Sequence, residues 1–126
     1  MTLLQSCEGI YYATSTRKRK ELVVARTEFQ KIKKDKTVDR KFVLVKDDKL
    51  AFPICLNKKS ENEFTAVLLE CTHRGCELNV GGGIYSCPCH GSEFTLQGEV
   101  IEGPAIHDLK TFTTYTDHEN IYINLS

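Results

Sequence analysis

Four residues of this 126-residue chain carry donor atoms suited to a soft metal centre. Residues 71–76 read Cys-Thr-His-Arg-Gly-Cys, with one residue between Cys71 and His73. Residues 87–92 read Cys-Pro-Cys-His-Gly-Ser, with two residues between Cys87 and His90. A thiolate is a soft donor and an imidazole is a borderline one. The set therefore suits zinc or an iron–sulfur cluster rather than magnesium or calcium.

Each segment also contains a glycine, Gly75 or Gly91, and a second cysteine, Cys76 or Cys89. Glycine lets the backbone turn without steric cost and so allows amide N–H groups to point inward, toward sulfur. The second cysteines are candidates for a disulfide, distinct from the metal ligands. A disulfide framework in a secreted protein would account for six cysteines, but it does not explain two histidines beside two of them.

The composition is that of a soluble globular chain. Apolar residues make up 40% and charged residues 27%, and 17 basic side chains balance 17 acidic ones, so the net charge gives no reason to expect a nucleic-acid partner. The length suits one domain. No apolar run approaches the length of a membrane span.

Residues 1–20 are predicted to form an N-terminal arm or linker that precedes a single domain over residues 21–126. Residues 4–7 resemble the end of a bacterial lipoprotein signal, which makes Cys7 a candidate for lipidation, although the apolar region that should precede it is nearly absent. Two basic stretches, residues 17–20 and 31–36, are interpreted as solvated surface. Either stretch suits an acidic partner or anionic lipid.

From residue 40 onward the sequence predicts strands and no long helix, so the expected fold class is all-β with small antiparallel sheets. Pro53 predicts an edge position or a bulge in the strand that contains it, and residues 57–63 are expected to form a polar loop. Residues 21–36 are compatible with a short helix, although Leu22 to Ala25 favours a strand. The predicted strands cover residues 41–45, 50–56, 64–69, 84–86, 94–96, 99–101, 109–115 and 121–125. Both ligand segments then fall on loops between strands.

Three other residues with reactive side chains are given ordinary roles. His107 and His118 lack a nearby cysteine pair and are interpreted as surface or structural histidines. Cys55 lies in an apolar strand and is predicted to behave as a small buried hydrophobic residue.

The two segments closely resemble the ligand loops of Rieske iron–sulfur proteins, and residues 103–105, Gly-Pro-Ala, resemble that family's third loop. The likeness extends from about residue 41 to residue 125. It implies a Rieske-type fold whose cluster-binding subdomain spans about residues 70–105. It also implies a [2Fe–2S] cluster with Cys71 and Cys87 on one iron and His73 and His90 on the other. Neutral imidazoles in place of two thiolates make such a cluster easier to reduce.

The resemblance further implies roles around the cluster. Cys76 and Cys89 match the disulfide of the family's high-potential branch, and such a bridge requires an oxidising compartment or burial. Ser92 matches a serine whose hydroxyl donates to a bridging sulfide, which raises the potential. Gly75, Gly91 and Pro104 are expected to lie next to the cluster.

Two positions depart from the pattern of the quinol-oxidising members. Phe94 replaces a tyrosine that donates to a ligand sulfur, which predicts a lower potential than in the tyrosine-bearing relatives. Arg74 replaces a leucine at the tip that enters the quinol pocket. A guanidinium is difficult to bury in an apolar pocket, so Arg74 favours a polar or acidic docking partner.

The leading hypothesis is a one-electron transfer protein of a respiratory or related chain, located in the periplasm or another extracytoplasmic compartment. Its redox protein partners are not identified by the sequence. The alternative is a ferredoxin-like carrier for an oxygenase, which is compatible with a cytoplasmic location. A remote alternative from another class is a structural zinc module, because two cysteines and two histidines also suit tetrahedral zinc.

Overall fold

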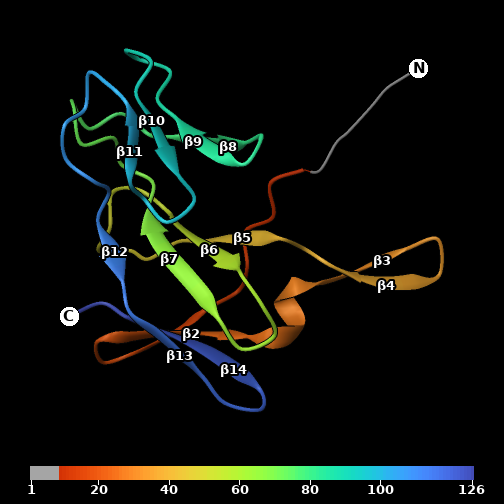
Figure 1. Cartoon of the computed structure of the whole chain (residues 1–126). Helices are drawn as coiled ribbons and strands as arrows, with labels where there is room; N and C mark the ends of the chain where they lie inside the picture. The colour runs from red at the N-terminus through yellow and green to blue at the C-terminus, as the bar shows by residue number, and fades with distance from the viewer. Residues whose placement is uncertain (1–8) are drawn as a thin grey trace.

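The structure, a computed structural model, describes residues 9–126, which form fourteen β-strands and one short 3₁₀ helix (Figure 1). The strands make three four-stranded sheets and one two-stranded sheet, and the pairings between these strands are antiparallel. The predicted all-β class is therefore confirmed. Within the described residues, no helix is long and apolar enough to span a membrane. Cys7 lies outside the described residues.

The first sheet has the strand order β1-β2-β14-β13 and covers one face of the molecule. Along β14, Ile121 and Ile123 are fully buried while Tyr122 between them is partly exposed, as the alternating sequence predicts. The strands of this sheet are β1 (Thr16–Lys18), β2 (Glu21–Ala25), β14 (Asn120–Asn124) and β13 (Thr114–Thr116).

The second sheet has the order β12-β7-β6-β5 and is buried on both faces. Along β6, Ile54 and Leu56 belong to the core shared with the first sheet, whereas Cys55 belongs to a second core on the other face. This double burial explains why these strands read as continuous apolar runs. The strands are β12 (Thr111–Phe112), β7 (Phe64–Leu68), β6 (Ile54–Lys58) and β5 (Phe42–Val45).

The third sheet, ordered β11-β10-β9-β8, packs over the second core and carries the ligand loops. Tyr85 and Phe94 from this sheet are fully buried against Cys55 and its neighbours. The sheet thus fixes the ligand loops to the outer face of the second sheet. Its strands are β8 (Asn79–Gly81), β9 (Ile84–Ser86), β10 (Glu93–Thr95) and β11 (Val100–Glu102).

The segment between β2 and β5 contains the short helix and the fourth sheet. The predicted short helix is only the single 3₁₀ turn η1 (Arg26–Phe29), anchored by buried Phe29. A hairpin follows, formed by β3 (Gln30–Lys33) and β4 (Lys36–Asp39), so the basic stretch from residue 31 to 36 is a hairpin and its turn. Lys34 and Asp35 both adopt positive φ, which matches the right-handed twist of a two-residue hairpin turn.

Two expectations for the second sheet are wrong. Pro53 creates neither an edge position nor a bulge, because β6 begins at Ile54 immediately after it and lies between β5 and β7. A proline just before the strand costs no ladder donor, and its carbonyl accepts from the N–H of Leu69. The expected polar loop also begins later, because Asn57 and Lys58 still belong to β6 and Asn57 is buried.

Part of the expected N-terminal arm is built into the fold. Residues 16–18 pair with β2 as an edge strand, Ala13 is buried, and backbone hydrogen bonds join residues 11 and 13 to Leu44. All three residues of β1 are exposed, and the strand is held by backbone pairing and by an ion pair between Arg17 and Asp47 at 2.6 Å. It therefore leaves no apolar periodicity in the sequence.

Candidate metal centre

The first ligand loop follows β7 and is closed by its own backbone. The N–H of Cys71 donates to the carbonyl of Cys76, and the N–H of Gly75 donates to the carbonyl of Cys71, both at 2.8 Å. Gly75 has φ +74°, and a β-carbon there would lie 3.4 Å from Oε2 of Glu70. A larger residue would strain the turn that positions Cys71 and His73.

The second ligand loop joins β9 to β10 and has the same closure. The N–H of Cys87 donates to the carbonyl of Ser92 at 2.8 Å, and the N–H of Gly91 donates to that of Cys87 at 3.0 Å. Gly91 has φ +84°. Each loop therefore begins at a cysteine and turns at the glycine four residues later. Counted from the first cysteine of each loop, however, His73 is the third residue and His90 is the fourth.

The thiols of Cys71 and Cys87 lie together in the interior, since both residues are almost fully buried. Burial raises the pKa of the Cys87 thiol. Hydrogen bonds from the Cys71 side chain and from the N–H groups of Cys89 and His90 lower it, and the net pKa lies below its ordinary value. Inward-pointing amides of this kind also stabilise a thiolate that binds a metal.

The two imidazoles lie on the outer side of the loops. The ring centroids of His73 and His90 are 5.0 Å apart and the rings are perpendicular. His90 is exposed and His73 is partly buried, yet Nδ1 of His73 is buried with no hydrogen-bond partner. A buried nitrogen without a hydrogen-bond partner lowers the stability of the folded state by about 1–3 kcal/mol. A metal bound to this nitrogen would supply the missing partner. Two adjacent thiols, two adjacent imidazoles and this nitrogen fit a two-iron cluster with unlike ends.

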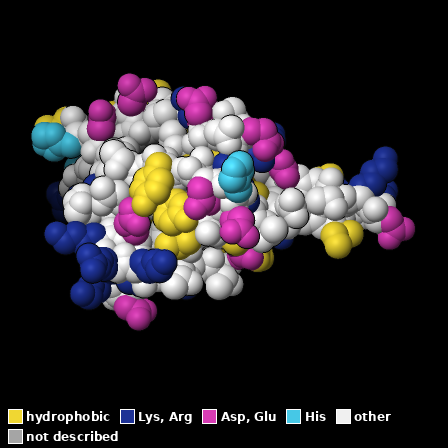
Figure 2. Space-filling model, turned by 90° about the horizontal axis from the view of Figure 1, so that it is seen from below, with side chains coloured by type: hydrophobic (Ala, Val, Ile, Leu, Met, Phe, Trp, Pro, Cys, Tyr) yellow, Lys and Arg dark blue, Asp and Glu magenta, His cyan; other side chains and the backbone are white. Residues whose placement is uncertain are grey.

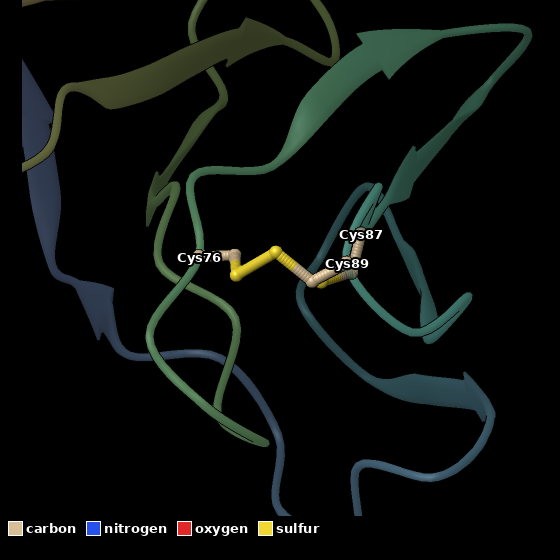
Figure 3. Close-up of side chains that lie close together, drawn as sticks. All are labelled: Cys76, Cys87 and Cys89. Atoms are coloured by element: carbon tan, nitrogen blue, oxygen red, sulfur yellow. A yellow bond between two sulfur atoms is a disulfide. The ribbon is translucent and has the colours of Figure 1, made fainter.

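A disulfide between Cys76 and Cys89 ties the two ligand loops together (Figure 3). The sulfur atoms of Cys76, Cys87 and Cys89 all lie within 4.8 Å of one another. Because two of these sulfurs are bonded to each other, the trio is not an ion site of its own. The bridge instead fixes Cys87 and the loop around it relative to the first loop.

The third loop is pinned to both ligand loops. The N–H of Ala105 donates to Oγ of Ser92 at 2.9 Å, and Oγ1 of Thr72 donates to the carbonyl of His107 at 2.5 Å. Pro104, after a cis peptide bond, is exposed beside them. The sequence indicated this loop only through Gly103-Pro104-Ala105. Thr72 was not anticipated, because a threonine that donates to a distant carbonyl leaves no sequence signal.

The two residues that depart from the quinol-oxidising pattern have opposite environments. Arg74 is exposed at the tip of the first loop, and Phe94 is fully buried in β10. Phe94 has no polar atom to donate to sulfur.

A buried polar group between the second and third sheets was not anticipated from the sequence. The side-chain amide of Asn57 donates to the hydroxyl of Tyr85, which donates to the carbonyl of Leu96 at 3.2 Å. Burial is the main cause that raises the pKa of Tyr85 well above its ordinary value, with Cys55 adding to it. Burial also raises the pKa of Cys55 to about 11. Cys55 thus behaves as the predicted buried hydrophobic residue.

Comparison with known proteins agrees with this geometry. The family model of the Rieske [2Fe-2S] domain matches residues 20–113. The chain belongs to this family. Its members carry a Rieske [2Fe–2S] cluster, and a one-electron transfer role follows for the Rieske domain described here.

Among individual proteins, the chain is 43% identical over 53 residues to the cytochrome b6-f complex iron-sulfur subunit of Synechococcus sp. (strain JA-2-3B'a(2-13)). That match covers 40% of this chain and 31% of the relative, so the chain matches only about a third of the relative's length.

Two solved structures share the Rieske fold. One is the cyanobacterial plasma membrane Rieske protein PetC3 from Synechocystis PCC 6803. It is 34% identical with a TM-score of 0.58, over 67% of this chain and 86% of that one. The other is a complex of reduced oxygenase and oxidized ferredoxin in carbazole 1,9a-dioxygenase. That match is 22% identical with a TM-score of 0.52, over 66% of this chain and 79% of that one, and it shows the fold alone.

Proposed function

We propose that Cys71 and Cys87 bind one iron of the cluster and that His73 and His90 bind the other. When bound, the cluster takes up and releases one electron. The buried thiols hold the inner end, and the backbone N–H groups of Cys89 and His90 lower the pKa of Cys87, which favours the thiolate that binds iron. The histidines form the accessible end through which a partner exchanges electrons, because His90 is exposed.

We further propose that the protein works in an extracytoplasmic compartment as part of a respiratory or related electron-transfer chain. The observation that carries this proposal is the disulfide between Cys76 and Cys89, because Cys89 is exposed and an exposed bridge persists in an oxidising compartment. The likeness to a plasma membrane Rieske protein supports a location at a membrane. Lipidation of Cys7 is a further proposal for how the protein is held at a membrane.

A redox titration tests this proposal. Two imidazole ligands, the Ser92 hydroxyl and the disulfide predict a midpoint in the upper part of the range of Rieske centres, which is roughly −150 to +300 mV. Acid-labile sulfide and iron measured on the same sample test for the cluster itself. A colourless protein that holds zinc would instead support the structural zinc module.

A ferredoxin-like carrier for an oxygenase is the second candidate, and exposed Arg74 favours it. A guanidinium at the tip suits an acidic docking surface better than an apolar quinol pocket. The two candidates differ in one measurement: a strongly negative midpoint would support the carrier and contradict the high-potential proposal.

A further inference from the structure

The β3–β4 hairpin projects from the body of the protein and pairs with no other described strand (Figure 1). It lies on the side of the molecule away from the ligand loops, and Figure 2 shows basic side chains at its end with an acidic side chain beside them. A two-stranded hairpin has little stability of its own. The side chains that the hairpin exposes therefore suit a role in binding rather than in stability.

One face of the hairpin is lined with lysines. Residues directly opposite each other share a face, and the register pairs Lys33 with Lys36 and Lys31 with Val38. Lys31, Lys33 and Lys36 thus lie on the same face, and none of them forms an ion pair within residues 9–126. Like charges placed directly opposite destabilise a strand pair. An anionic partner would remove that cost.

The lysine face continues onto the body of the protein. A hollow of about 240 Å³ at the root of the hairpin is lined by Lys31 and Lys33 and also by Arg40 and Lys41. Lys41 also lines a neighbouring hollow of about 620 Å³, together with Lys59. We call the cations of this continuous surface the basic strip: Lys31, Lys33, Lys36, Arg40, Lys41 and Lys59.

The cations of the basic strip form no ion pair within residues 9–126, and Asp39, which also lines the smaller hollow, is paired with Lys58 instead. The guanidinium of Arg40 donates to the carbonyls of Glu28 and Gln30 and stacks over Tyr11, without an acidic partner among the described residues. Lys58 is left out of the strip, because Asp39 at 2.8 Å and Glu61 at 3.2 Å neutralise it. In a chain of net charge zero, this surface is a local excess of positive charge.

We propose that the basic strip binds the anionic surface of a lipid membrane. Apolar side chains lie among its lysines: Ile10, 47% exposed, and partly exposed Phe42 line the larger hollow. Lysines mixed with apolar residues suit the headgroup region. Because the strip lies away from the ligand loops, such binding would leave His73 and His90 free for a redox partner.

The position of the N-terminal residues favours a membrane over an acidic protein as the occupant. Gly9 lines the smaller hollow and Ile10 the larger. Cys7 precedes Gly9 by two residues, which span at most about 7 Å of extended chain. An acyl chain at Cys7 would therefore anchor the same face. A lipid anchor at Cys7 and the basic strip would then act on the same membrane surface, and each would add to the binding.

The experiment measures sedimentation of the full, cluster-containing chain with lipid vesicles. All proteins carry Cys7→Ser, so that no acyl chain contributes. The vesicles are phosphatidylcholine alone or phosphatidylcholine mixed with phosphatidylglycerol. The test variant is Lys31→Gln/Lys33→Gln/Lys36→Gln. The matched control is Lys18→Gln/Arg19→Gln/Lys20→Gln, which removes the same charge from the exposed β1–β2 turn.

The parent protein is expected to bind the phosphatidylglycerol vesicles, to bind neutral vesicles far more weakly, and to dissociate as salt rises. Each lysine near an anionic surface contributes enough that the test variant should lose affinity by roughly 100-fold. The control should stay within about twofold of the parent. The visible spectrum of the cluster checks that each variant is folded.

Three results would overturn the proposal: no binding of the parent to anionic vesicles, equal binding to neutral ones, or an equal loss in the two variants. The first would point to an acidic protein as the occupant, and the last would mean that total charge, not the basic strip, drives binding. None of these results bears on the redox midpoint, so failure here is distinguishable from failure of the proposed electron-transfer role.

Discussion

The backbone N–H of Ala105 donates a hydrogen bond to Oγ of Ser92, and Ser92 has no exposed surface. The oxygen is thereby occupied as an acceptor, while its own proton remains available for donation. The contact also joins the third loop to the end of the second ligand loop. One hydroxyl group thus links the third loop to the loop that supplies Cys87 and His90.

Replacing Ser92 with alanine is expected to lower the midpoint potential. A hydroxyl that donates to the cluster stabilises the more negative, reduced state. If the hydroxyl stabilises the reduced state by about 1.4 kcal/mol more than the oxidised state, its removal lowers a one-electron midpoint by roughly 60 mV. A redox titration measures this shift. Ser60→Ala on an exposed loop is the control and should leave the potential unchanged, and an unchanged potential in Ser92→Ala would contradict the donor role.

Removing the disulfide is expected to shorten the lifetime of the cluster. Cys76 and Cys89 are 13 residues apart, and a loop of about this length contributes about 3 kcal/mol when closed. The double variant Cys76→Ser/Cys89→Ser should lose its visible absorbance many times faster on mild heating. Cys55→Ala keeps the bridge and serves as the control. Equal rates for the double variant and the parent would mean that the bridge does not stabilise the site.

Replacing Tyr85 with phenylalanine is expected to destabilise the domain. The change removes the hydroxyl that accepts from Asn57 and donates to Leu96, and it leaves a buried amide without its partner. Losing this partner is expected to lower the free energy of unfolding by about 1–3 kcal/mol. Thermal unfolding followed by circular dichroism measures it. Tyr115→Phe is the matched control, because Tyr115 is 51% exposed and its hydroxyl meets only the surface carboxylate of Glu21. Similar losses in both variants would argue against a special role for the buried group.

The sequence predicted those parts of the molecule that depend on short spacings. Cys71, His73, Cys87 and His90 stand in loops whose glycines and cysteines leave a local pattern, and the strands that alternate or run apolar were placed within a few residues. The edge strand β1, the β3–β4 hairpin and the continuation of β6 through Asn57 were missed. The strand predicted over residues 109–115 is two strands, β12 and β13, that belong to different sheets. β1 is held by backbone pairing and by the ion pair between Arg17 and Asp47, and only a distant tyrosine hydroxyl explains the burial of Asn57. Contacts between residues far apart in the chain leave no periodic trace.

The thiol of Cys55 is expected to resist alkylation until strongly alkaline pH. Burial raises its pKa from 9.0 to about 11, so at pH 8 its thiolate fraction is about 100-fold smaller than for an exposed cysteine. The same shift makes the folded state lose stability as pH rises from 9 toward 11, because the unfolded thiol ionises first. Mass spectrometry of the peptide containing Cys55, after timed iodoacetamide treatment of native and denatured protein, checks both points. Rapid labelling of the native protein at pH 8 would contradict the burial of this thiol.

Phe94→Tyr is expected to raise the midpoint potential. Phe94 is fully buried in β10, two residues after Ser92, and in the quinol-oxidising relatives the resemblance implies a tyrosine there that donates to a ligand sulfur. A hydroxyl at this position would stabilise the reduced state, and a gain of about 1.4 kcal/mol corresponds to roughly +60 mV. Phe64→Tyr, in the core shared with the first sheet, controls for the cost of burying a hydroxyl. Both variants should unfold at lower temperature, but only Phe94→Tyr should change the potential. If neither changes it, the hydroxyl does not reach the sulfur, and the difference from the tyrosine-bearing relatives must lie in the loops.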